Sequence, residues 1–136
     1  RGGRVAIRVA AKSIAKMKVR VRQLTRRVRG RSLDQIAVEL RRYLLGWRGY
    51  FGLAETPGVL RDLDEWIRHR LRAVQLKHWK RGRTIYRELV VRGMSPTKAK
   101  QVAVNARSWW RNSALGIHTA VPNSLFDELG VPRLAT

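Results

Sequence analysis

Few side chains in this sequence have the type and spacing that catalysis or metal binding requires. The histidines are His69, His78 and His118, and the first two lie nine positions apart, without the i, i+4 spacing of a ligand pair on one helix face. Cysteine is absent, which excludes disulfides, thiolate zinc sites and cysteine nucleophiles. No glycine-rich phosphate loop follows a strand pattern, and no combination of serine and histidine suggests a triad. We expect neither an active site nor a metal site in these 136 residues.

The acidic residues are equally poor candidates for chemistry. Asp62 and Asp64 are two positions apart in a segment with helical periodicity, which puts them about 200° apart around the axis. They therefore cannot hold Mg²⁺ together or act as an acid and base pair. Asp62 could instead meet Asp34 or Glu65 across a bundle, but salt bridges with neighbouring arginines are the simpler interpretation.

Positive charge dominates the composition. Lys and Arg number 30 against 9 Asp and Glu, which gives a net charge of +21, and residues 1–33 contain twelve of these cations and no acid. Ordinary solvated helix faces mix both signs, because opposite charges at i, i+4 stabilise helices. The imbalance indicates a polyanion partner, most simply nucleic acid bound through its phosphates with a steep dependence on salt.

Tryptophans accompany the cations in the remainder of the chain. Trp47 and Trp66 fall on or beside apolar stripes and are expected to pack in the core, whereas Trp79 fits packing and base stacking about equally well. The Trp109-Trp110 pair lies between two arginines. We expect one of these two indoles to pack and the other to face nucleic acid.

The elements that carry these residues are predicted to be helices, apart from residues 4–9, whose alternation favours a short strand or an extended lead-in. Ser13 can cap a helix that ends near Gly30. Its apolar stripe comprises Ile14, Met17, Val21, Leu24 and Val28. Basic residues occupy the flanks of that stripe, so this helix is apolar on one side and cationic on the rest.

Two further helix starts are clear. Ser32-Leu-Asp-Gln35 reads as a capping box for a helix to about Phe51, with Gly52 as its stop. Thr56-Pro57 begins a helix that continues to about Trp79. The apolar faces of the two helices are Ile36, Leu40, Tyr43, Leu44 and Trp47, and Leu60, Leu63, Ile67, Leu71 and Val74. Three helices with short links and one apolar face each predict a three-helix bundle over residues 12–80.

The basic, glycine-containing residues 80–83 are the best candidate for a domain boundary. Beyond them we predict a helix over 84–92 closed by Gly93, one from Ser95-Pro96 to about Trp110, and a short one over 122–129. The predicted fold is all-α. It comprises a lead-in over residues 1–11, the three-helix bundle over 12–80, and a small helical basic domain over 81–136.

Several motifs resemble those of a known family. Residues 41–51 read Arg-Arg-Tyr-Leu-Leu-Gly-Trp-Arg-Gly-Tyr-Phe, residues 54–57 Ala-Glu-Thr-Pro, residues 63–68 Leu-Asp-Glu-Trp-Ile-Arg, and residues 77–81 Lys-His-Trp-Lys-Arg. With Arg-Leu-Arg at 70–72, Val-Pro-Asn at 121–123, Phe126 and Leu-Gly at 129–130, they resemble the maturase-specific region of group II intron reverse transcriptases over roughly residues 12–133. Leu45 and Gly49 stand where that family commonly has Arg and Asn.

This resemblance implies that residues 12–80 are the thumb, or domain X, which grips template–primer and intron RNA for splicing, reverse transcription and intron mobility. Residues 81–136 would be a small DNA-binding domain. The catalytic palm, with its Mg²⁺, would lie upstream in a parent RNA-directed DNA polymerase, so no cofactor is expected here. The implied partners are intron RNA, RNA–DNA template–primer, target DNA and the rest of that chain. The implied location is the bacterial cytoplasm, with nucleoid association on target DNA.

The residues that this interpretation assigns to nucleic acid are all but one cationic. Those expected to contact RNA are Lys12, Lys16, Lys18, Arg20, Arg22, Arg26, Arg27, Arg29, Arg31, Arg68, Arg72, Lys77, Lys80 and Arg81. Those expected to contact DNA are Arg83, Arg87, Lys98, Lys100, Arg107, Trp110 and Arg111.

Two other interpretations stay open. A stand-alone basic DNA-binding protein would need a recognition helix, for which residues 95–100 are the only candidate. A module that binds protein through the tryptophan-rich C-terminal part would leave the +21 charge unexplained. No apolar run approaches the ~18 residues of a membrane span. The start Arg-Gly-Gly-Arg lacks an initiator Met and a signal-peptide pattern, so we expect a piece of a longer protein.

Overall fold

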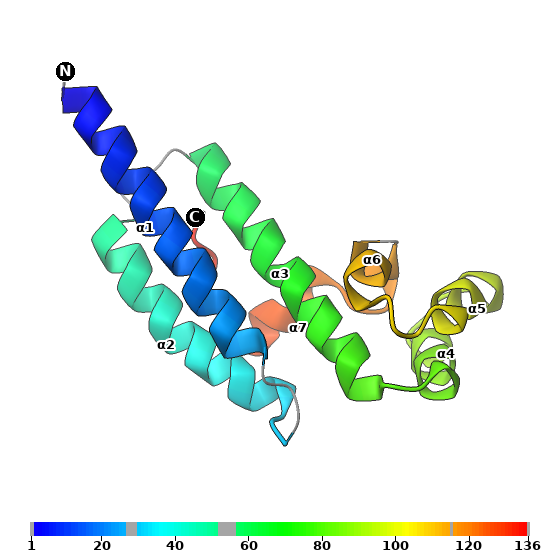
Figure 1. Cartoon of the computed structure of the whole chain (residues 1–136). Helices are drawn as coiled ribbons and strands as arrows, with labels where there is room; N and C mark the ends of the chain where they lie inside the picture. The colour runs from blue at the N-terminus through cyan, green and yellow to red at the C-terminus, as the bar shows by residue number, and fades with distance from the viewer. Residues whose placement is uncertain (1, 27–29, 52–56, 115, 136) are drawn as a thin grey trace.

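The computed structural model describes residues 2–26, 30–51, 57–114 and 116–135 (Figure 1). Within these ranges every regular element is helical, which confirms the predicted all-α class. The elements in chain order are α1 (Gly2–Arg26), α2 (Leu33–Phe51), α3 (Pro57–Trp79), α4 (Gly82–Val91), α5 (Pro96–Val104), α6 (Trp109–Ala114), the 3-10 turn η2 (Ile117–Thr119) and α7 (Asn123–Glu128).

The first helix is longer than the sequence pattern predicts. It begins at Gly2, so the expected strand or extended lead-in over residues 4–9 is wrong. Val5 and Val9 fit the i, i+4 spacing of a helix as well as the alternation of a strand. A pattern of six residues is too short to distinguish the helical period from the strand period. Ser13 is consequently a buried residue inside α1 rather than its cap.

The second and third helices follow the sequence closely. The Ser32 hydroxyl accepts from the Gln35 backbone N–H at 3.1 Å, and the Gln35 side chain accepts from the Ser32 N–H at 2.9 Å, which confirms the capping box. Pro57 is the first residue of α3, while Gly52 and Thr56 lie outside the described residues. The predicted apolar faces are buried, with Tyr43 half-buried.

Figure 1 shows α1, α2 and α3 as long helices side by side, with α6 next to the second half of α3 and α4 and α5 as a pair beyond its end. Gly82 allows the close approach of that pair, because a Cβ there would lie 2.7 Å from the carbonyl oxygen of Ala103. The helix expected from Ser95 to Trp110 instead ends at Val104. The Asn112 amide donates to the carbonyls of Val102 and Asn105 at 3.3 and 2.7 Å, which satisfies acceptors at that helix end.

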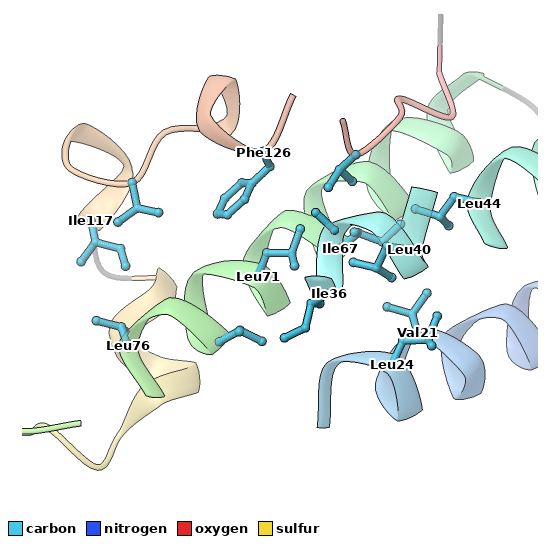
Figure 2. Close-up of a cluster of buried hydrophobic side chains, with 14 of the residues drawn as sticks. Val21, Leu24, Ile36, Leu40, Leu44, Ile67, Leu71, Leu76, Ile117 and Phe126 are labelled. Carbon is cyan, nitrogen blue, oxygen red and sulfur yellow. The ribbon is translucent and has the colours of Figure 1, made fainter. Parts of the chain in front are cut away.

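One hydrophobic core extends through the bundle and the C-terminal segment (Figure 2). Ile117 and Phe126 pack into the same cluster as Leu40 and Leu71. Gly130, with a φ of 93°, ends α7 in the left-handed conformation that glycine adopts without strain. The chain then returns to α2, where Arg41 donates to the Gly130 carbonyl at 3.1 Å. The boundary at residues 80–83 stays a prediction, but residues 117–135 pack on the bundle.

Candidate nucleic-acid interface

The first helix presents a row of cations to solvent. Met17, Val21 and Leu24 bury one face of α1, and the segment contains no acid. Among the described residues, no ion pair involves an α1 cation. The predicted RNA-contacting residues of α1 that are exposed are Lys12, Lys16, Arg20, Arg22 and Arg26. Lys18 is half-buried, and Arg27 and Arg29 lie outside the described residues.

The indole of Trp66 on α3 is in contact with three cations, two from α1 and one from α3. The Lys18 ammonium lies 5.3 Å from the ring centroid, the Arg22 guanidinium 5.4 Å and the Arg70 guanidinium 5.7 Å. These distances are within the range of cation–π attraction, which restrains long side chains that would otherwise be mobile. Trp66 is half-buried; it therefore links α1 to α3 in addition to packing.

Arg70 completes the connection between the two helices. Its Nε donates to the Thr25 hydroxyl at 2.9 Å, and that hydroxyl donates to the Val21 carbonyl at 2.8 Å. Burial lowers the pKa of Arg70 below its ordinary value, and the charges of Arg22 and Arg26 lower it further. Positive charge is thus crowded here, and an anion at this surface would relieve the repulsion.

Arg31 differs from the α1 cations because it has an acidic partner. It is half-buried and forms an ion pair with Glu39. Its backbone carbonyl accepts a hydrogen bond from Nε2 of His78 at 2.7 Å. Arg31 therefore connects the residues just before α2 to α2 itself and to the end of α3. It also lines an open cavity of about 410 Å³ with Arg20 and Arg26.

Two predicted RNA-contacting arginines are in the core, and this corrects their assignment. Arg68 is 0% exposed and donates to Asp127 at 2.8 Å and to the Val131 carbonyl at 3.1 Å. Arg72 is 1% exposed and donates to the Val121 carbonyl at 2.8 Å and to the Asn123 side chain. Both guanidinium groups hold the C-terminal segment on α3, so neither can reach a phosphate in this conformation.

Asp64 forms the expected salt bridge with a neighbouring arginine, Arg68, but it is buried rather than on the surface, and it binds the same C-terminal segment. Asp64 is 2% exposed and accepts the backbone N–H groups of Leu134 and Ala135. Its Oδ1 lies 3.7 Å from Nη1 of Arg68. Charged residues are rarely buried unless they are paired. A hydrophobic pattern that treats every charged residue as exposed therefore cannot predict the burial of Asp64, Arg68 and Arg72.

The cations assigned to the end of α3 and beyond are mostly on the surface. Lys80 and Arg81 are exposed, whereas Lys77 is half-buried with its ammonium 5.0 Å from the Trp109 ring centroid. Burial lowers the pKa of Lys77, and the charge of Arg70 lowers it further. The predicted DNA-contacting cations are all exposed: Arg83, Arg87, Lys98, Lys100, Arg107 and Arg111.

Neither indole of the Trp109-Trp110 pair is buried, contrary to the expectation that one would be. Trp109 is 37% exposed and Trp110 46%. Trp110 stacks on His69, with the ring centroids 3.5 Å apart and the planes 16° apart, and His69 Nε2 donates to the Trp110 carbonyl at 2.9 Å. The pair is therefore positioned by α3 while much of its surface stays open to solvent.

The described part of the chain has no group of three histidine, cysteine or acidic residues placed to hold a metal ion. None of the helices in the described ranges is long and apolar enough to cross a membrane.

Comparison with known proteins agrees with the motifs. A search of the curated proteins found no match. The family model of the group II intron, maturase-specific domain matches residues 14–92, more than half of the chain. This stretch contains the exposed α1 cations from Lys16 onward, the capping box of α2, all of α3, and Trp66 with the three cations around it. The chain therefore belongs to the group II intron maturase-specific domain family.

Proposed function

We propose that this chain binds group II intron RNA through the cations of α1 and the cations around Trp66, as part of the maturase function in splicing. The observation that carries the proposal is the surface of α1. Its exposed cations have no ion pair within the described residues, and its opposite face is fixed to the bundle. Such an array contacts phosphates rather than base edges, so it suits a structured RNA whose shape positions the phosphates.

The proposal extends to two further nucleic acids, an RNA–DNA template–primer and target DNA. The same face would grip an RNA–DNA template–primer if the parent chain is a reverse transcriptase, with the catalytic Mg²⁺ in a palm outside these residues. Target DNA would contact α4 and α5, which are joined by the four residues 92–95. A short glycine-containing turn between two helices is typical of DNA-binding helix pairs, and Lys98 and Lys100 are exposed on the second helix.

The test compares two triple variants with equal loss of charge. Lys12, Lys16 and Arg20 are changed to Gln in the first, and Arg83, Arg87 and Lys98 to Gln in the second. Affinity for a structured group II intron RNA is measured over a salt series. Each lost phosphate contact should reduce the slope of log affinity against log salt by about 0.7–0.9. The loss of three contacts in the α1 variant should therefore reduce the slope by about 2–3.

The second triple variant is the matched control. It should keep most of the slope on RNA and lose affinity for duplex DNA instead. Equal slopes for both variants on the intron RNA would show that only the total charge matters and would refute the assignment to α1. Preference of the unaltered chain for one duplex DNA sequence over intron RNA would favour a stand-alone DNA-binding protein.

A further inference from the structure

A cavity of about 260 Å³ lies where α1, α3 and α6 meet. Its lining combines two cations of α3 with two indoles of α6, and no acid is among the lining residues. Its polar, charged and aromatic lining residues are Thr25, Arg70, Lys77, Trp109 and Trp110. Lys77 was expected to contact RNA and Trp110 to contact DNA, but both residues line this one cavity.

We propose that this cavity accepts one unpaired nucleotide of the bound nucleic acid, with its base against the indoles and its phosphate between Arg70 and Lys77. This rests on the proposed function, since the nucleotide belongs to a nucleic acid that the α1 cations hold.

The cations favour an anion at this place. Arg70 and Lys77 are two helical turns apart, on one side of α3, and both line the cavity. Both side chains are partly buried, and burial lowers the pKa of each. The charges of Arg22 and Arg26 lower the pKa of Arg70 further, and the charge of Arg70 does the same to Lys77. In the described chain Arg70 is tied to a neutral hydroxyl, that of Thr25, and Lys77 to the ring of Trp109. A phosphate would supply the negative charge that the cavity lacks.

The indoles favour a flat base. Base–aromatic stacking requires rings that are exposed and already oriented. Trp109 and Trp110 are both more than one third exposed. Lys77 restrains the first and the His69 stack restrains the second. His69 lines a neighbouring cavity and not this one, whereas both indoles line this one.

The size favours one nucleotide. Pockets for drug-sized ligands begin at about 300 Å³, and this cavity is slightly smaller. It can therefore admit a single base but not a base pair. A base within a continuous duplex is also stacked on its neighbours and cannot reach the indoles, whereas a bulged, looped or terminal nucleotide can.

The test uses two RNA hairpins with equal numbers of phosphates, one fully paired and one with a single bulged nucleotide. We expect the unaltered chain to bind the bulged hairpin about tenfold more tightly, which corresponds to about 1.4 kcal/mol. Changing Trp109 and Trp110 together to Leu should remove that preference and leave the affinity for the paired hairpin unchanged. Lys77→Met should also lower the preference while keeping both indoles.

Two control variants lie outside the cavity. Trp79→Leu removes a half-buried indole that, like Trp109, has a cation over its ring, in this case Arg92. Arg61→Met removes an exposed cation of α3. Both should retain the preference for the bulge. Helicity measured by circular dichroism checks the folding of each variant, and Lys77→Met decides the outcome if the double tryptophan variant loses helicity.

The outcomes separate this inference from the function on which it rests. Tight, salt-dependent binding of both hairpins with equal affinity would refute the nucleotide site and leave the RNA-binding face standing. Failure of the unaltered chain to bind either hairpin would refute the proposed function and the site together. Loss of the preference in Trp79→Leu or Arg61→Met would also refute the site, because neither residue lines the cavity.

Discussion

The carboxylate of Asp64 accepts the backbone N–H of Leu134, seventy positions later in the chain, at 2.9 Å by one oxygen and 3.1 Å by the other. One turn further along α3, Arg68 donates to Asp127 and to the Val131 carbonyl. Asp64 and Arg68 thus hold the last residues of the described chain against the helix that carries Trp66. The buried charges of α3 stabilise the fold, whereas the α1 cations that the proposed function assigns to RNA are mostly exposed.

Asp64→Leu should lower the free energy of unfolding by about 3–5 kcal/mol. The change leaves the Leu134 and Ala135 N–H groups without an acceptor and removes a buried negative charge next to Arg68. Asp64→Asn keeps an acceptor and should cost less. Urea unfolding followed by circular dichroism measures both. Asp62→Asn, at an exposed position of the same helix, should change stability by no more than about 0.5 kcal/mol; equal losses at the two positions would contradict the role of Asp64.

Phe126→Ala should destabilise the bundle as well as the C-terminal segment. Phe126 is 0% exposed and belongs to the same core cluster as Leu40 and Leu71, and such changes cost about 3–5 kcal/mol. We expect a single cooperative transition at lower urea concentration. The measurement compares far-ultraviolet circular dichroism with tryptophan fluorescence. Two separate transitions, with the first three helices unaffected, would show that residues 81–136 fold independently.

The prediction from sequence worked where the signal is local. The capping box of Ser32 and Gln35 needs only four residues, and the apolar stripe of α2 repeats within one helix, so both could be found without knowledge of any partner. The cationic face of α1 is local in the same sense, because its apolar stripe determines which side remains for charge.

One local prediction failed, because the alternation over residues 4–9 is too short to distinguish a strand from the helix that is present. The other failures occurred where a residue's partner is distant. Arg68 pairs with a residue 59 positions away and Asp64 with one 70 positions away, and no periodicity marks either as buried. The stack of His69 on Trp110 joins residues 41 positions apart. The break between α5 and α6 depends on the Asn112 side chain, which reaches back seven and ten positions to carbonyls. These contacts follow from tertiary packing, which helical patterns do not encode.

Asp127 should make stability depend on pH in the acid range. Its hydrogen bond from Arg133 is the main reason that its pKa lies below the ordinary value; burial opposes this, and Arg68 adds to the lowering. Because the unfolded chain then binds more protons, this contribution is complete above the unfolded pKa of about 3.9 and is lost as the pH falls through the folded-state pKa.

The measurement is urea unfolding of the unaltered chain and of Asp127→Asn, from neutral pH down to about pH 2. The two stabilities should differ at neutral pH and converge at the acid end. A difference that stays constant would show that Asp127 acts through packing or neutral hydrogen bonds. Glu128→Gln, at the exposed next position, serves as the control and should follow the unaltered chain throughout.

Trp66→Leu should weaken RNA binding without changing the number of phosphate contacts. The indole restrains Lys18, Arg22 and Arg70 by contact with their charged groups, so its loss leaves the charges present but free to move. Immobilising a long side chain on binding costs about 0.5–1.5 kcal/mol, and the variant must meet this cost for the cations that the indole no longer restrains.

The expected signature of Trp66→Leu is therefore a lower affinity for intron RNA with an unchanged salt slope. Arg22→Gln, by contrast, removes a contact and should reduce the slope by about 0.7–0.9. Comparing the two variants across a salt series separates positioning from charge. A reduced slope in Trp66→Leu would mean that the cations no longer reach the RNA at all, so that the indole is required to place them rather than to restrain them.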